Sequence, residues 1–165
     1  MLLYGMRRGS PWDLLRWALN KHYGLDALPE VQLGAHGKPY FPALPWVHFN
    51  LSHSGDYSLC ALSSAPVGVD IECVRPRRET LPRYALTEKE YARYCAEGGD
   101  WPAFFAQWTR REAWCKYTGR GLAVSRGQDA PEGLRFASYG GKDWRAAVCG
   151  EEAPPAEIIW LEELS

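Results

Sequence analysis

The residues best suited to chemistry are two carboxylates in the segment VGVDIE, residues 67–72. Its β-branched residues favour a strand, in which Asp70 and Glu72 share one face with Gly68. Their Cα atoms would lie roughly 6.5 to 7 Å apart, so both side chains could reach one cation. We expect Gly68 to leave open space beside them. A solvated strand face is the simpler interpretation of an isolated D-x-E pattern, so the metal hypothesis depends on context.

A third carboxylate and a lysine lie on a predicted helix at residues 100–121, which has an aspartate at its start and glycines at 119 and 121. Glu112 and Lys116 follow Phe104 and Trp108 at intervals of four. An acid and a base thus continue an apolar row. Taken alone, the two charges are better explained as an ordinary surface pair one helical turn apart.

The elements that must position these residues are a mixture of strands and helices. Alternation predicts strands, and capping residues predict helices that end at glycines. The expected strands are 1–6, 47–51, 57–64, 67–72, 144–150 and 158–164, and the expected helices are 10–24, 85–99 and 100–121. Residues 37–46 predict an irregular loop, and residues 52–56 a turn. Because these elements do not alternate as regular βαβ units, we expect an α+β fold.

Composition limits the class of protein. A chain of 165 residues with 46% hydrophobic residues and a net charge of −1 predicts one globular unit that is not a general nucleic-acid binder. The five cysteines are scattered without a C-x-x-C pair, so neither a disulfide framework nor a zinc site is indicated. The N-terminal apolar run is too short for a signal peptide. We expect a cytoplasmic monomer that does not interact with membranes.

Four motifs occur in order: GKPYF from Gly37, FNLSHS from Phe49, VGVDIE from Val67 and WTRREAWCKYTGRGL from Trp108. This order resembles the Sfp-type 4′-phosphopantetheinyl transferases, whose motifs are GKP, FN-x-SHS, G-[VI]-D-[IV]-E and W-x-x-KEA-x-x-K-x-x-G-x-GL. The resemblance covers residues 37–122. It departs from the family pattern at Arg111, where the family usually has lysine, and in the short stretch before GKP.

The resemblance implies two similar α/β halves packed as a pseudodimer, residues 1–65 and 66–165, within one compact unit. VGVDIE and the SHS residues would lie at the seam between the halves. It also implies transfer of the 4′-phosphopantetheine group from coenzyme A to a serine of an apo acyl or peptidyl carrier protein. Adenosine 3′,5′-bisphosphate would be released.

By the same resemblance, Asp70, Glu72 and Glu112 would hold Mg²⁺, or Mn²⁺ as an alternative ion. Glu112 would also act as the general base, and Lys116 would contact a phosphate during catalysis. The residues expected to contact coenzyme A are Arg7, Arg8, Lys38, Ser52, His53, Arg111 and Lys116. Glu90 matches a further acid of the family, although a capping box at the start of its helix explains it equally well.

The short stretch before GKP leaves Arg7 and Arg8 as the counterparts of the family's contacts to the 3′-phosphate. We therefore expect 3′-dephospho-coenzyme A to be a comparatively good donor. Two other functions fit some of the same residues. A Mg²⁺-dependent phosphohydrolase of coenzyme A would use the acids to position water instead of a serine. An inactive carrier-protein or nucleotide-binding module would keep the fold alone, but the intact acids and Lys116 argue against it.

Overall fold

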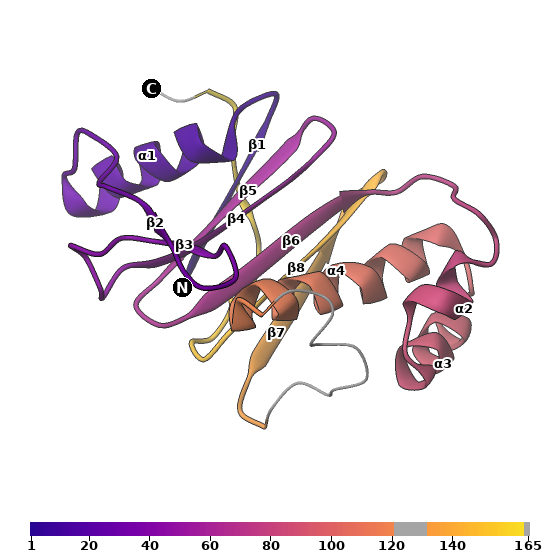
Figure 1. The fold of residues 1–165 in the computed structure, drawn as a ribbon. Helices are drawn as coiled ribbons and strands as arrows, with labels where there is room; N and C mark the ends of the chain where they lie inside the picture. Colours follow the sequence, from indigo (N-terminus) through magenta and orange to yellow (C-terminus); the bar gives the residue numbers. More distant parts are fainter. Residues whose placement is uncertain (121–131, 164–165) are drawn as a thin grey trace.

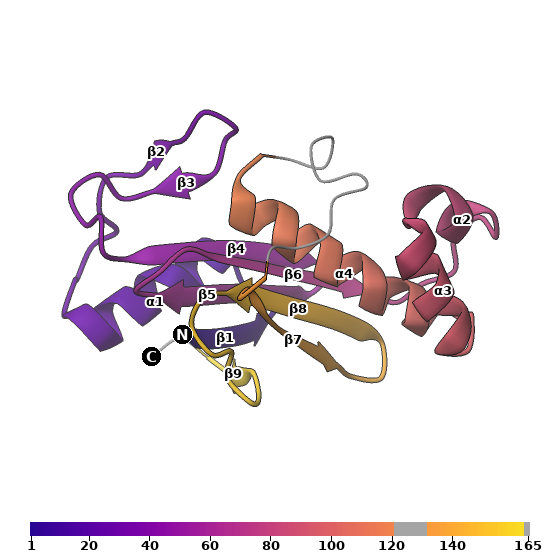
Figure 2. The ribbon, with the colours of Figure 1, turned by 90° about the horizontal axis from the view of Figure 1, so that it is seen from below.

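The described part of the chain contains two larger sheets, and the VGVDIE motif forms an edge strand of the second, beside a long helix (Figures 1 and 2). The computed structural model describes residues 1–120 and 132–163. The first sheet has the order β4-β5-β1-β9 and the second has the order β6-β8-β7. Their strands are β1 Leu2–Arg7, β4 His48–Ser54, β5 Tyr57–Ser63, β6 Val67–Cys73, β7 Arg135–Gly140, β8 Trp144–Gly150 and β9 Ile159–Leu161. A short hairpin joins β2 Gln32–Leu33 to β3 Pro39–Tyr40.

Strand direction confirms a mixed α+β architecture. In the first sheet, β5 pairs antiparallel with both β1 and β4, and in the second sheet β8 pairs antiparallel with both β6 and β7. Strand β9 adds parallel to β1, so residues 159–161 belong to the sheet of the N-terminal part of the chain.

The helices begin and end close to where the capping residues predict. They are α1 Pro11–Tyr23, α2 Leu81–Ala85, α3 Glu88–Ala96 and α4 Trp101–Thr118. Ser10 caps α1, and Gly24 ends it with a φ of 66°, a left-handed conformation that favours glycine. Thr87 and Glu90 form the expected capping box of α3. None of the described helices is both long and apolar enough to cross a lipid bilayer.

One apolar core lies between the two sheets. Its buried residues include Leu3, Leu59, Val67, Val69, Ile71 and Val148. A second cluster holds α1 against the first sheet, and includes Tyr4, Leu15, Leu19, Phe49 and Leu62. A smaller cluster joins Ala113 and Trp114 of α4 to Ala147 and Cys149 of β8. With Val67, Val69 and Ile71 facing the core, the alternating residues of β6 face α4.

The local structure differs from the expected elements in two places. The predicted turn at residues 52–56 is shorter, because β4 continues to Ser54. Its polar residues are strand residues that bind a neighbouring strand, which their composition alone does not indicate. Helix α2, Leu81–Ala85, is not among the expected helices. The second glycine expected to end the long helix, Gly121, lies outside the described residues.

Candidate active site

Strands β4 and β6 belong to different sheets and are joined by side chains of β4. From Asn50 to Ser54, every second side chain of β4 accepts a hydrogen bond from a backbone N–H of β6. The pairs are Asn50 with Val69, Ser52 with Ile71 and Ser54 with Cys73, at 2.9, 3.2 and 3.1 Å. We call this contact the seam. It satisfies backbone donors of β6 that no neighbouring strand pairs on this side.

Gly68 brings helix α4 directly onto β6. A Cβ atom at this position would lie 2.0 Å from the carbonyl oxygen of Ala113 and 2.4 Å from the backbone nitrogen of Tyr117. The expectation that Gly68 leaves open space beside the acids is therefore wrong, because the helix backbone fills that space. The glycine instead permits the close approach that places residues of α4 beside the acidic face of β6.

Asp70, Ser52 and Lys116 form a hydrogen-bonded group at this approach. Asp70 is only 4% exposed. Its Oδ1 accepts from Lys116 Nζ at 2.7 Å and from the Ser52 hydroxyl at 2.8 Å. Lys116 Nζ also donates to Ser52 Oγ at 2.9 Å. With Ile71 N–H as its other donor, the Ser52 hydroxyl uses its single proton and both lone pairs within the protein.

The Asp70 carboxylate keeps one oxygen without a partner, since its buried Oδ2 makes no hydrogen bond. Burial raises the pKa of Asp70, while Lys116 and then Ser52 oppose that rise. Burial also raises the pKa of Glu112 to about 7, and the charge of Asp70 adds to the effect. The charges of Asp70 and Glu72 thus both help to raise the pKa of Glu112, as neighbouring like charges do.

The carboxylate oxygens of Asp70, Glu72 and Glu112 suit a hard cation, although these side chains are not gathered into a closed set of ligands. Within residues 1–120 and 132–163, no three Asp, Glu, His or Cys side chains are gathered closely enough to hold a metal ion. The chemistry is nevertheless suitable, because Mg²⁺ prefers a few carboxylate oxygens completed by water and substrate. Asp70 offers an unpartnered oxygen, and Glu72 is held by a 2.8 Å hydrogen bond from Ser54.

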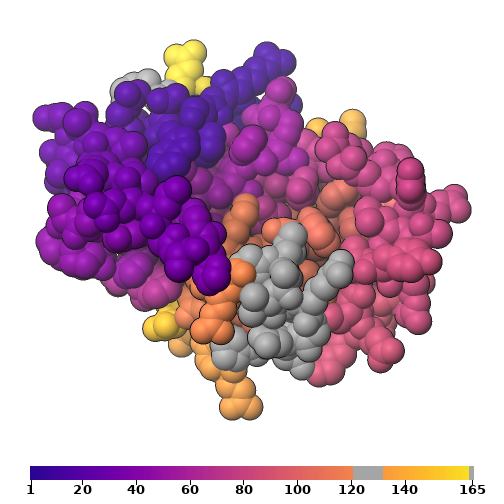
Figure 3. Space-filling model, viewed as in Figure 1, coloured from indigo at the N-terminus to yellow at the C-terminus, as the bar shows by residue number. Residues whose placement is uncertain are grey.

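A cavity of about 370 Å³ opens beside Glu112 and Lys116, and Lys38, Asn50 and Gly119 also line it. An adjoining cavity of about 350 Å³ is lined by Tyr40, His48, Pro66 and Thr118 among others. His36 and Lys38 line both cavities. On this face, the violet N-terminal segment meets the orange end of α4 (Figure 3). No sequence pattern singles out His36 or His48, apart from the position of His36 just before GKP.

Lys38 connects the GKP loop to both elements of the acidic site. Its ammonium donates to the carbonyl oxygen of Val67 at 3.1 Å and to that of Tyr117 at 2.9 Å. Burial lowers the pKa of Lys38 to about 8. The aliphatic part of the Lys38 side chain lies close to Gly119, since a Cβ atom added there would lie 3.3 Å from Lys38 Cδ. Contact between Lys38 and coenzyme A stays a prediction.

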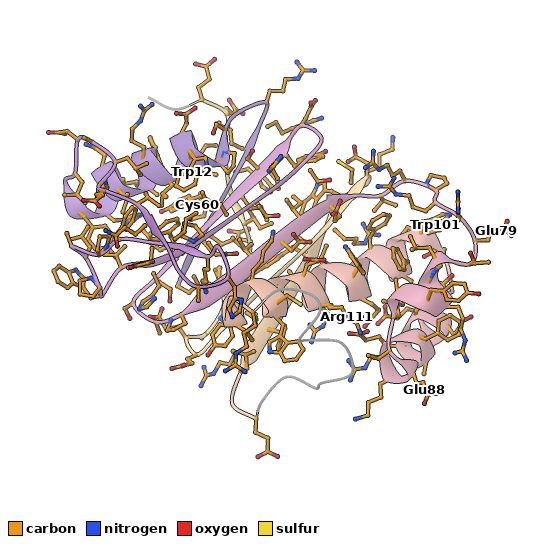
Figure 4. All side chains as sticks on the ribbon, in the orientation of Figure 1. Trp12, Cys60, Glu79, Glu88, Trp101 and Arg111 are labelled. Carbon is orange, nitrogen blue, oxygen red and sulfur yellow. The ribbon has the colours of Figure 1, made fainter. Side chains whose placement is uncertain are left out.

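Arg111 contacts helix α3 and the end of α2. Its side chain is 5% exposed and forms an ion pair with Glu90, and it also donates to the carbonyl oxygen of Ala85 at 2.6 Å. Figure 4 labels Arg111 on α4 and Glu88 at the start of α3. All three guanidinium nitrogens are engaged. A contact from Arg111 to coenzyme A stays a prediction, whereas Glu90 gains a structural role as its partner.

His53 lies at the other end of the seam from Lys38. It is an exposed residue of β4, opposite Ser58 of β5. The Ser58 hydroxyl donates to the carbonyl oxygen of Gly9 at 2.5 Å, which places His53 near the chain segment that leads into α1. Its side chain points away from β6, because Ser52 and Ser54 on either side of it face the seam.

Arg7 ends β1 in the same region, and Arg8 follows it. The Arg7 guanidinium lies over the ring of Tyr57, 5.1 Å from its centroid. Arg8 pairs with Asp56 at 3.4 Å, and both of these side chains are largely exposed. Neither arginine lines the two cavities beside Lys38. Binding of a coenzyme phosphate by Arg7, Arg8 or His53 stays a prediction.

Comparison with known proteins assigns the family. The family model of the 4′-phosphopantetheinyl transferase superfamily matches residues 66–149. A 4′-phosphopantetheinyl transferase of Bacillus subtilis is 38% identical over 115 residues, which cover 67% of this chain and 51% of that protein. The transferase AcpT of Salmonella typhi is 41% identical over 120 residues, which cover 70% of this chain and 61% of that protein.

The chain therefore belongs to the 4′-phosphopantetheinyl transferase superfamily, as the four motifs predict. The matched region includes β6, α4 and β8, and thus the strand and helix that carry Asp70, Glu72, Glu112 and Lys116. The matches span about half to two thirds of the length of these relatives.

Proposed function

We propose that this chain transfers the 4′-phosphopantetheine group from coenzyme A to a serine hydroxyl of an apo acyl or peptidyl carrier protein. In this reaction a new bond forms between the serine oxygen and phosphorus. The phosphoanhydride bond of coenzyme A breaks, and adenosine 3′,5′-bisphosphate leaves. The observation that carries the proposal is the buried Asp70 carboxylate with an unpartnered oxygen, which pairs with Lys116 where Lys116 and Glu112 line a cavity.

Glu112 is the general base of the proposed reaction. It lines the cavity, and burial raises its pKa to about 7. A base with a pKa near the working pH accepts a proton more effectively than an ordinary glutamate does. Glu112 therefore takes the serine proton as the bond to phosphorus forms.

Lys116 provides positive charge for the phosphoryl oxygens. Phosphoryl transfer requires positioning and fixed positive charge more than a covalent nucleophile, because negative charge is spread over the transferred group. Lys116 lines the same cavity as Glu112, and its ammonium donates a hydrogen bond to Asp70. Lys38 stands at the boundary of both cavities and is the second cation that coenzyme A would meet.

Asp70, Glu72 and Glu112 would hold Mg²⁺, with Mn²⁺ as an alternative. The ion would supply charge neutralisation at the pyrophosphate oxygens of coenzyme A. The unpartnered oxygen of Asp70 and the raised pKa of Glu112 beside the other two carboxylates support this assignment. Arg7, Arg8 and His53 would reach coenzyme phosphates from the other end of the seam.

The order of elements supports the pseudodimer. Both sheets are built in the same order along the chain: one strand, then a helix that packs on the sheet, then two further strands. The first series is β1, α1, β4 and β5, and the second is β6, α4, β7 and β8. In each series the third strand, β5 or β8, lies between the other two strands of the series. The seam then lies between the halves, where a ligand site is expected. We further propose that the protein acts as a cytoplasmic monomer.

Product analysis tests the proposed function. The full chain is incubated with coenzyme A and MgCl₂, with and without an apo carrier protein, and adenosine 3′,5′-bisphosphate is quantified by chromatography. We expect release only when the carrier is present. Release of the same amount without a carrier would identify a phosphohydrolase instead, and no release with any of several acyl and peptidyl carriers would favour an inactive binding module.

A further inference from the structure

We propose that Ser54 is a positioning residue that orients the Glu72 carboxylate toward the cation. This inference rests on the proposed function. The Ser54 hydroxyl accepts from the N–H of Cys73 at 3.1 Å and donates to Oε2 of Glu72 at 2.8 Å. A backbone group of β6 thus fixes the hydroxyl, and the hydroxyl directs its only proton at the neighbouring acid of the same strand.

Glu72 needs such a partner more than Asp70 does. A glutamate side chain has more rotatable bonds than an aspartate and loses more conformational entropy when it is held in one place. Asp70 is buried, whereas Glu72 is half-buried near the end of its strand. Repulsion from Asp70 would also favour a Glu72 rotamer that turns out to solvent. The hydrogen bond from Ser54 opposes that movement.

The spacing along β4 shows why the serines occur where they do. Ser52 donates to Asp70 and Ser54 donates to Glu72, and each serine precedes its acid by 18 residues. The S-x-S pattern of one strand therefore matches the D-x-E pattern of the other, one hydroxyl for each carboxylate. Asn50, the third side chain of the seam, binds the N–H of Val69 and supports neither acid.

Metal titration separates positioning from a purely structural role. Mn²⁺ is titrated into the full chain in the presence of coenzyme A, and free Mn²⁺ is quantified by its electron paramagnetic resonance signal against a coenzyme-only blank. Ser54→Ala should raise the Mn²⁺ dissociation constant by about tenfold, the usual effect of removing a residue that orients a metal ligand. Ser54→Thr, which keeps the hydroxyl, should restore most of the affinity.

Ser58→Ala is the matched control. Ser58 is a buried serine on the neighbouring strand, and its hydroxyl donates to the carbonyl oxygen of Gly9 instead of to an acid. This substitution also removes one serine hydrogen bond, so thermal unfolding should detect it. Its Mn²⁺ dissociation constant should stay within about twofold of the wild-type value, because the Ser58 hydroxyl donates to Gly9 and not to a proposed metal ligand.

Glu72→Ala distinguishes failure of this inference from failure of the proposed function. If Glu72→Ala weakens Mn²⁺ binding but Ser54→Ala behaves like Ser58→Ala, the role of Ser54 is wrong and the metal site stands. If Glu72→Ala leaves the affinity unchanged, the proposed metal site is wrong and the inference falls with it. In the Glu72→Ala background, Ser54→Ala should have no further effect on Mn²⁺ affinity, because Ser54 acts through Glu72.

Discussion

The ammonium of Lys116 lies 2.7 Å from Oδ1 of Asp70, although 46 residues separate them in the sequence. The pair joins α4 to β6 near Gly68, where the lack of a side chain lets the helix backbone approach the strand closely. The family resemblance implies a cation as the partner of Asp70 and a phosphate as the partner of Lys116. In the structure the two side chains pair with each other, and a charged group in the interior requires such a partner.

Because Asp70 pairs with Lys116 whereas Glu72 accepts from Ser54, substitution of the two acids should change stability to different extents. On repulsion alone, alanine at either position would leave thermal stability unchanged or higher. Asp70→Ala also leaves Lys116 and Ser52 without their partner, so it should lower the free energy of unfolding by about 1 to 3 kcal/mol. Glu72→Ala should change it by less than about 1 kcal/mol, because a half-buried carboxylate is replaced. Urea denaturation measures both values.

Both variants should lose carrier labelling at limiting Mg²⁺, since each lacks one proposed ligand. Labelling near the wild-type rate by either variant would contradict the metal assignment. Equal stability of the two variants would contradict a stabilising role for the Lys116–Asp70 pair.

Glu112→Gln tests the general base. Glutamine has nearly the same shape but cannot accept the serine proton, so kcat should fall by about 10²-fold or more. The dissociation constant of coenzyme A should change much less. Steady-state kinetics and isothermal titration calorimetry measure the two quantities. An unchanged kcat would remove Glu112 as the base.

Gly68→Ala tests the close approach of α4. The added Cβ would lie 2.0 Å from the Ala113 carbonyl oxygen, so the helix must move away from β6. We expect a loss of about 2 kcal/mol or more in the free energy of unfolding, as for overpacked interiors. At Gly34 the nearest atom to an added Cβ is the Lys38 carbonyl oxygen at 3.5 Å, an ordinary contact. Gly34→Ala is therefore the control, and equal stability of the two variants would contradict this role of Gly68.

Lys38→Met tests the lysine that binds Val67 and Tyr117. Burial lowers the pKa of Lys38 to about 8, whereas the unfolded chain keeps a pKa near 10.5. Between these values the unfolded state binds a proton that the folded state has released, so the stability of the wild type should rise with pH relative to Lys38→Met. Denaturation at pH 7, 8, 9 and 10 measures the difference. A difference that stays constant or falls across this range would contradict the assignment.

The sequence predicted most of the regular structure around the site. The alternation of Val67, Val69 and Ile71 placed the acids on one face of β6, and the capping residues placed the ends of α1, α3 and α4. These signals are local, so one sequence is sufficient to detect them. The four motifs also predicted the family correctly.

The relations between distant segments could not be predicted in this way. The SHS residues look like a turn by composition, but Ser52 and Ser54 bind β6 across the seam. Arg111 stands next to Glu112 in the sequence, yet a helix directs adjacent side chains about 100° apart, and Arg111 binds Glu90. The contacts of Lys38 likewise depend on how β6 and α4 pack, which no local pattern specifies.

Intact-mass spectrometry of the carrier protein tests the central claim most directly. An apo carrier is incubated with coenzyme A, MgCl₂ and the full chain, and a carrier whose acceptor serine is replaced by alanine is treated in parallel. We predict that the intact carrier gains the mass of one phosphopantetheine group and that the alanine carrier gains none. Consumption of coenzyme A with no mass gain on any acyl or peptidyl carrier would contradict the assignment of this chain as a phosphopantetheinyl transferase.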